Sequence, residues 1–138
     1  MVALLDTHCG LYMANTAEKI ASERKIPREA QDEFALRSQQ RATDAMQNGR
    51  LKEEIVGVPV GRKGEVITED DHVRSDATMD GLAKLKPAFA KDGFVTAGNA
   101  SGIVDGAAML VVTTSEAAKE KGKTPLGRIV SWGIAGCD

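Results

Sequence analysis

The sequence predicts an α/β fold, and three observations support it. Residues 15–49 carry apolar side chains at helical spacing. The segments 55–60, 107–113 and 129–134 are short apolar runs of the kind that form strands. A short helical pattern over residues 115–121 separates the last two runs, so strand, helix and strand follow one another within about 30 residues, as in an α/β unit.

The first expected helix begins near Asn15. Asparagine can cap the helix there, and Glu18, three residues later, can return the bond, which is the capping-box pattern. The basic Arg24 and Lys25 lie where this helix ends, beside its partly negative carboxyl end. Residues 1–13 show no clear periodicity and are expected to form a loop.

The second expected helix runs from Pro27 to Gly49. Proline suits the first turn because its missing N–H would have no partner there, and glycine tolerates the left-handed conformation that ends helices. Glu29 and Asp32 lie near the positive end of the helix, and Phe34 belongs to its apolar face. Its other charges are interpreted as a solvated face rather than a binding patch.

The middle of the chain predicts a hairpin and a short helix. The apolar residues of 55–60 are mostly β-branched and indicate a strand, residues 61–64 indicate a turn, and residues 66–67 can pair back. Residues 78–85 indicate one or two helical turns that end before Pro87.

Four glycines lie among small and polar residues in the segment 93–106. Glycine lets a backbone approach a ligand closely, Ser101 offers a hydroxyl, and Asn99 offers both a donor and an acceptor. A strand rather than a long helix is expected next, and the Lys-Ser/Thr ending is missing, so the segment is not a P-loop. From spacing alone it is either a tight structural turn or a ligand-binding loop.

Other reactive side chains form no recognisable centre. His8, Cys9, His72 and Cys137 match no zinc spacing, and neighbours in sequence such as His8 and Cys9 seldom face each other as a nucleophile pair. Cys137 is interpreted as a buried or terminal thiol and His72 as a solvated side chain.

The acidic run 69–71 is followed closely by a lone cation, Arg74. Adjacent carboxylates on one loop are usually hydrated, whereas acid–base chemistry needs opposed groups across a cleft. Arg74 is accordingly expected either to form an ion pair with this run or to contact a phosphate.

Composition narrows the classes of function. A net charge of −2 gives no electrostatic drive toward nucleic acid, and no apolar run approaches the length of about 20 residues that spans a membrane. Two well-separated cysteines do not make a disulfide scaffold, which favours a reducing compartment. No secretory signal is recognisable at the N-terminus.

The glycine-rich segment also resembles a family motif. Val95-Thr96-Ala97-Gly98-Asn99-Ala100-Ser101-Gly102, followed by Asp105-Gly106-Ala107-Ala108, is similar to a thiolase signature. Four further blocks resemble thiolase blocks in the same order: Met13 with Thr16-Ala17-Glu18; Gln31-Asp32-Glu33-Phe34-Ala35 with Ser38-Gln39; Leu82-Ala83-Lys84-Leu85-Lys86-Pro87-Ala88-Phe89; and Pro125-Leu126-Gly127-Arg128-Ile129-Val130 with Gly136. The blocks cover essentially the whole chain.

The resemblance implies a partial thiolase fold. Thiolases resemble one another in having two fused α/β halves, each with a mixed sheet, layered αβαβα, and a loop domain in the first half that holds coenzyme A. Residues 1–102 would be most of this loop domain, 103–124 the end of the N-terminal half, and 125–138 the start of the C-terminal half.

The implied function is that of a fragment of an acyl-CoA C-acyltransferase. The family cleaves 3-ketoacyl-CoA with coenzyme A, or condenses acyl-CoA units, through a cysteine acyl-enzyme. Neither Cys9 nor Cys137 matches a family catalytic position, so no catalytic residue is assigned and the chain alone is expected to be inactive. The alternatives are a non-catalytic module that binds coenzyme A or acyl-CoA, and a remnant that interacts with a full thiolase.

The resemblance also implies a coenzyme A site. Its residues would be Ser101 on the pantetheine arm, Arg74 at the nucleotide end, Phe89 and Ala97 along the tunnel wall, Leu4 in the tunnel and Met13 near the acyl group. Tyr12 stands where biosynthetic-type members carry histidine, which leaves acyl-chain preference and direction open.

The other implied properties follow from the same resemblance. Coenzyme A would be a substrate, with no cofactor and no metal. The parent enzyme would be a homodimer or homotetramer without nucleic-acid or membrane partners, in the cytoplasm, mitochondrion or peroxisome.

Overall fold

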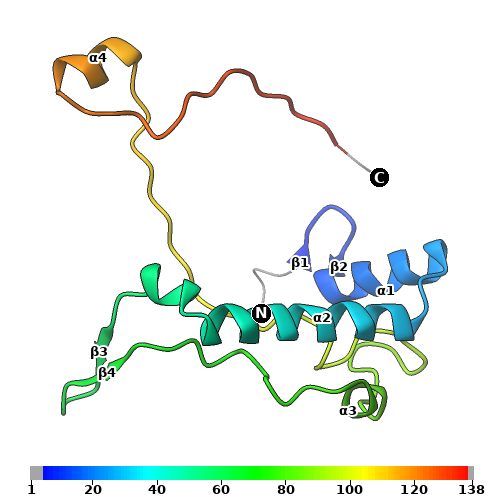
Figure 1. Cartoon of the computed structure of the whole chain (residues 1–138). Helices are drawn as coiled ribbons and strands as arrows, with labels where there is room; N and C mark the ends of the chain where they lie inside the picture. Colours follow the sequence, from blue (N-terminus) through cyan, green and yellow to red (C-terminus); the bar gives the residue numbers. More distant parts are fainter. Residues whose placement is uncertain (1–4, 137–138) are drawn as a thin grey trace. The chain divides into compact units, whose positions relative to one another are not determined.

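The computed structural model describes residues 5–136, so Leu4 and Cys137 lie outside the described residues. The chain forms two units, Met1–Ile103 and Val104–Asp138. Their elements in chain order are β1 (Leu5–Asp6), β2 (Leu11–Tyr12), α1 (Met13–Arg24), α2 (Arg28–Gln47), the 3-10 helix η2 (Arg50–Glu53), β3 (Val58–Val60), β4 (Glu65–Ile67), α3 (Met79–Ala83) and α4 (Ser115–Glu120) (Figure 1).

The opening segment is a small hairpin, so the prediction of a loop over its described part was wrong. Strands β1 and β2 pair antiparallel, with Leu5 opposite Tyr12 and Asp6 opposite Leu11. The connecting turn includes Gly10 at φ 69°. Asp6 Oδ1 accepts hydrogen bonds from the backbone N–H of His8 at 2.8 Å and of Cys9 at 3.4 Å. The side chain of Asp6 thus stabilises the turn by binding two of its backbone N–H groups.

These bonds favour the ionised carboxylate. The backbone N–H of His8, and then that of Cys9, lowers the pKa of Asp6 below its ordinary value of 3.8. A lowered pKa means that the turn gains its stabilisation above pH about 3.9, where the unfolded carboxyl is ionised, and loses it as pH falls through the folded value. We expect the amide resonances of His8 and Cys9 to titrate together with a midpoint below that of Asp in a model peptide. Two-dimensional NMR from pH 2 to 6 measures this, and a midpoint at or above the peptide value would contradict it.

Helix α1 begins at Met13, one turn earlier in the chain than its capping pattern predicts. Tyr12, in extended conformation, is the N-cap residue and its side chain makes no capping bond. The capping box of Asn15 and Glu18 is therefore wrong, because Asn15 is already inside the helix. The predicted basic end is confirmed: α1 ends at Arg24, and Lys25 turns the chain in the left-handed region at φ 54°.

Helix α2 confirms its prediction to within two residues at each end. Pro27 is its N-cap residue, and Gly49, at φ 74°, ends the helical segment and opens η2. The buried residue of α2 is charged: the side chain of Asp32 is 2% exposed. Phe34, expected on an apolar inner face, is largely exposed. Ala42, Ala45 and Met46 of the predicted apolar face are half-buried, and the fully buried contact of this helix is the polar one made by Asp32.

The hairpin and the short third helix are confirmed. Strands β3 and β4 pair antiparallel, with Val58 opposite Ile67 and Val60 opposite Glu65. Thr78 caps α3, its Oγ1 accepting the N–H of Gly81 at 3.1 Å. Helix α3 lies against α2 and contributes Leu82 to the interior.

In the second unit, α4 is confirmed but two predicted strands are wrong. Thr114 Oγ1 caps α4 by accepting the N–H of Ala117 at 3.2 Å. Segments 107–113 and 129–134, expected as strands, are irregular and largely exposed, with Trp132 86% exposed. A strand needs a neighbour for its N–H and C=O groups and a surface that covers its apolar face. Residues 104–136 form no strand ladder with which these runs could pair.

Across residues 5–136, no helix combines the length and the apolar character that a membrane span requires.

Candidate functional site

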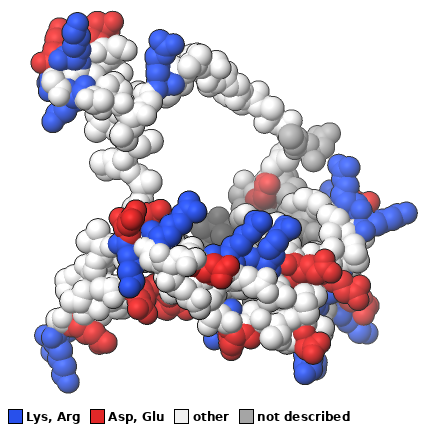
Figure 2. All heavy atoms as spheres, viewed as in Figure 1, with Lys and Arg blue, Asp and Glu red and all other residues white. Residues whose placement is uncertain are grey.

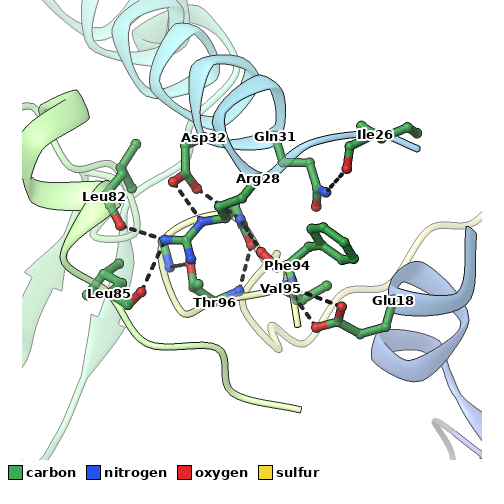
Figure 3. Close-up of polar contacts among 12 residues, drawn as sticks. Glu18, Ile26, Arg28, Gln31, Asp32, Leu82, Leu85, Phe94, Val95 and Thr96 are labelled. Carbon is green, nitrogen blue, oxygen red and sulfur yellow. Dashed lines mark hydrogen bonds and ion pairs between the residues drawn. The ribbon is translucent and has the colours of Figure 1, made fainter. Parts of the chain in front are cut away.

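The glycine loop, defined here as residues 93–102, is held at its start by a carboxylate from α1. Glu18 Oε2 accepts the N–H of Phe94 at 2.7 Å, and Glu18 Oε1 accepts the N–H of Val95 at 2.9 Å (Figure 3). A Cβ atom at Gly93 would collide with this carboxylate, so glycine at that position permits the approach. One side chain from α1 thus satisfies two successive backbone donors.

A second tether comes from α2. Asp32 Oδ1 accepts from the side-chain amide of Asn99 at 2.9 Å, and Asp32 Oδ2 accepts from Arg28 Nε at 2.7 Å. Arg28 Nη2 donates to the carbonyl of Leu82 in α3 at 2.6 Å and to that of Leu85, just after this helix, at 3.2 Å (Figure 3). The buried charge of Asp32 therefore has an ionic partner and also joins the loop to α3.

The first turn of the loop is folded around Thr96, whose side chain is fully buried. Asn99 Oδ1 accepts the N–H of Thr96 at 2.7 Å, while Asn99 Nδ2 also donates to the carbonyl of Phe94 at 2.9 Å. A Cβ atom at Gly98 would overlap the side chains of Leu82 and Leu85.

We define the anchoring network as the four side chains that make these bonds to the loop and between the helices: Glu18, Arg28, Asp32 and Asn99.

Beyond this turn, Ser101 is exposed. Ala97, within the turn, is exposed as well. A Cβ atom at Gly102 would collide with the imidazole ring of His72, so the ring lies directly against the loop backbone. The segment can therefore be both a structural turn and a ligand-binding loop. Residues 96–99 form a tight turn around the buried side chain of Thr96, and Ser101 follows with an exposed side chain that carries a hydroxyl.

The predicted site residue Arg74 lies two residues beyond that ring. Its backbone N–H donates to Gln39 Oε1 of α2 at 2.8 Å, and its side chain is exposed. Arg74 and side chains of α2 line a cavity of about 160 Å³. The contact of His72 with Gly102 therefore brings the segments that carry Arg74 and Ser101 together.

Phe89 lies next to the glycine loop as well. The N–H of Ala88 donates to the carbonyl of Val95 at 2.9 Å, so the chain that carries Phe89 runs beside the loop. Phe89 is 50% exposed, which leaves half of its ring surface available. Met13, the first residue of α1, is 69% exposed, and no described contact joins it to Ser101.

Charges are mixed on the surface. Figure 2 shows Lys and Arg side chains interspersed with Asp and Glu side chains on the face in view. Within the described part of the chain, the ion pairs are Lys19 with Glu23 and Arg28 with Asp32, so Arg74 does not pair with the acidic run as one interpretation expected. Asp70 Oδ1 instead accepts the N–H of His72 at 2.9 Å.

Residues 5–136 contain no group of three or more His, Cys, Asp or Glu side chains arranged to hold a metal ion. His8 and Cys9 are exposed in the turn between β1 and β2.

Sequence reasoning missed the anchoring network. It assigned Glu18 to a capping box and Asp32 to the helix dipole, and it left Arg28 without a role. The spacing of Arg28 and Asp32, four residues apart on one helix, was the available signal, because such side chains are neighbours on a helix surface. No local pattern indicates that Glu18 bonds to residues 94 and 95.

Comparison with known proteins gives a consistent result. A model of the thiolase N-terminal domain matches residues 1–116. The chain is 50% identical over 137 residues to an acetyl-CoA acetyltransferase of Rhizobium meliloti, covering 98% of this chain and 35% of that protein. It is 45% identical over 139 residues to the human mitochondrial 3-ketoacyl-CoA thiolase, covering 99% of this chain and 35% of that protein.

Solved structures agree. The crystal structure of the human mitochondrial 3-ketoacyl-CoA thiolase superposes with a TM-score of 0.85 at 44% identity, covering 99% of this chain and 35% of that one. The same enzyme in complex with CoA gives a TM-score of 0.78 at 44% identity, covering 91% of this chain and 31% of that one. The chain thus spans about a third of the length of the proteins it matches.

Proposed function

The chain belongs to the thiolase family, and from this membership we propose that it supplies the coenzyme A-binding part of an acyl-CoA C-acyltransferase. The complete enzyme would cleave 3-ketoacyl-CoA with coenzyme A, or condense acyl-CoA units, through a cysteine acyl-enzyme. Residues of this chain would shape the site for coenzyme A, and none of them would be catalytic.

The observation that carries the proposal is the exposed hydroxyl of Ser101 on an anchored loop beside the segment of Arg74. The pantetheine arm of coenzyme A offers amide groups that a hydroxyl can bind, and its nucleotide end carries phosphates that a guanidinium binds well. The human mitochondrial thiolase that was solved with CoA has the same fold over 91% of this chain, which further supports the proposal.

The remaining contacts are proposed by resemblance. Phe89 and Ala97 would wall the tunnel, Met13 would lie near the acyl group, and Leu4 would lie in the tunnel. Coenzyme A would be a substrate, with no separate cofactor or metal, and the complete enzyme would be a homodimer or homotetramer.

We also propose the domain assignment stated above for the complete enzyme. Residues 1–102 would belong to the loop domain, 103–124 to the end of the N-terminal half and 125–138 to the start of the C-terminal half. The division between the two units at Ile103 and Val104 supports the first boundary.

Binding of coenzyme A to the chain tests the proposal. We expect saturable binding in isothermal titration, and roughly ten- to hundredfold weaker binding in Arg74→Ala, because a charge-assisted hydrogen bond contributes about 1.5–3 kcal/mol. Ser101→Ala should weaken binding less, by a few-fold, because it removes a neutral hydrogen bond. Arg24→Ala, an exposed arginine at the end of α1, is the matched control and should bind as the parent chain does.

Two results would count against the proposal. If Arg74→Ala, Ser101→Ala and the control bind coenzyme A with equal affinity, then Arg74 and Ser101 do not contact it as proposed. Thiolysis of a 3-ketoacyl-CoA by the purified chain would show that catalytic groups lie within it. Circular dichroism of each variant establishes that the compared chains are equally folded.

A further inference from the structure

Glu18 contacts the glycine loop at Phe94 and Val95, which precede Ser101 in the chain. Its carboxylate is partly buried, and both of its oxygens are used by the N–H groups of Phe94 and Val95. Hydrogen bonds from backbone N–H groups to an ionised carboxylate are about twice as strong as neutral ones. Because consecutive donors are bound by a single rigid group, the direction of the backbone entering the loop is fixed.

The tether from α2 acts further along the same loop. Asp32 holds the amide of Asn99, and this amide closes the turn by bonding to the backbone at Phe94 and Thr96. Arg28 keeps the carboxylate of Asp32 in place. The loop is thus fixed at residues 94–95 and at residue 99, immediately before the exposed Ser101.

We propose that Glu18 is a positioning residue for the coenzyme A site. Its carboxylate, acting with Asp32, orders the backbone of residues 94–102 before the ligand arrives, so that binding does not have to order the loop. The identity of the ligand rests on the function proposed above, whereas the ordering of the loop rests on the contacts of Glu18 and Asp32. Gly93 is needed for this arrangement, because a side chain at position 93 would displace the carboxylate of Glu18.

Glu18→Gln is the direct test, because an amide keeps the size of the side chain but loses the charge and one acceptor. Amide hydrogen exchange is measured by NMR in the 138-residue chain, together with titration of coenzyme A. We expect about tenfold faster exchange at Phe94 and Val95, and about three- to tenfold weaker binding of coenzyme A through the lost order of the loop. Exchange within α2 should stay unchanged.

Two further variants make the result specific. Glu23→Gln makes the same change on the exposed side of α1, where Glu23 forms only a surface pair with Lys19, and should change neither quantity. Gly93→Ala removes no charge but displaces the carboxylate of Glu18, so it should reproduce both effects even if Glu18→Gln folds poorly.

The outcomes separate the two proposals. Exchange at Phe94 and Val95 that is equal in Glu18→Gln, Gly93→Ala and Glu23→Gln overturns the ordering role. Faster exchange with unchanged affinity for coenzyme A overturns the link between loop order and binding. Absence of binding in the unaltered, folded chain overturns the proposed function, and the exchange rates then still decide whether Glu18 orders the loop.

Discussion

Asp32→Ala is expected to lower the free energy of unfolding by about 3–5 kcal/mol, the usual consequence of removing one partner of a buried ion pair. The substitution leaves the guanidinium of Arg28 without its carboxylate and the amide of Asn99 without its acceptor. Since small domains have a total stability of about 5–15 kcal/mol, this loss is a large part of the whole. Urea unfolding at pH 7, followed by circular dichroism, measures it.

The neighbouring Glu33 provides the control. It is an exposed carboxylate on the same helix, so Glu33→Ala should change the stability by no more than about 0.5 kcal/mol. A similar small change in Asp32→Ala would show that the anchoring network does not stabilise the first unit. Complete loss of the unfolding transition in Asp32→Ala alone would be the extreme form of the expected result.

Asn99→Asp is expected to cost about 3 kcal/mol at pH 7, because it places a second carboxylate at the position of an amide 2.9 Å from an oxygen of Asp32. The change removes two donated hydrogen bonds, one to Asp32 and one to the carbonyl of Phe94. It also adds repulsion between like charges. This repulsion is removed only if one of the two carboxyl groups keeps its proton in the folded state.

The retained proton makes the stability of the Asn99→Asp variant depend on pH. In the unfolded variant both carboxyls ionise above pH about 4, whereas the folded variant retains a proton to higher pH. The folded state then binds more protons, so the stability of Asn99→Asp relative to the parent chain falls as the pH rises from 4 to 7. Asn15→Asp, in the first turn of α1, is the control. A stability difference that does not vary with pH would contradict the direct contact of residues 32 and 99.

Apart from the start of α1 and the short helix η2, the helices and the hairpin β3–β4 could be predicted from the sequence because short-range signals determine them. Pro27 and Gly49 mark the ends of the helical segment α2, and β-branched residues with a glycine-containing turn mark the hairpin. The thiolase resemblance rested on five blocks in order, and the family model and the solved structures confirm both the family and the α/β fold.

The sequence pattern could not predict features that depend on distant partners. Glu18 has the spacing of a capping residue, yet it bonds to residues 76 and 77 positions away. The apolar runs 107–113 and 129–134 have the composition of strands, but a strand forms only where a neighbouring strand is available to hydrogen-bond with its backbone. The roles of Ser101, Arg74, Phe89, Ala97 and Met13 toward coenzyme A stay predictions, and Leu4 lies outside the described residues.

The long sequence separation within the anchoring network also sets the order in which the site forms. Its long-range bonds join residues 54 to 77 positions apart, and closing chain segments of this length carries an entropic cost that contacts within one helix, such as Arg28 with Asp32, do not carry. Helix α2 can therefore form early from local contacts, whereas the glycine loop acquires its shape only after α1, α2 and α3 have come together. A peptide limited to residues 93–102 would contain the family motif without its conformation.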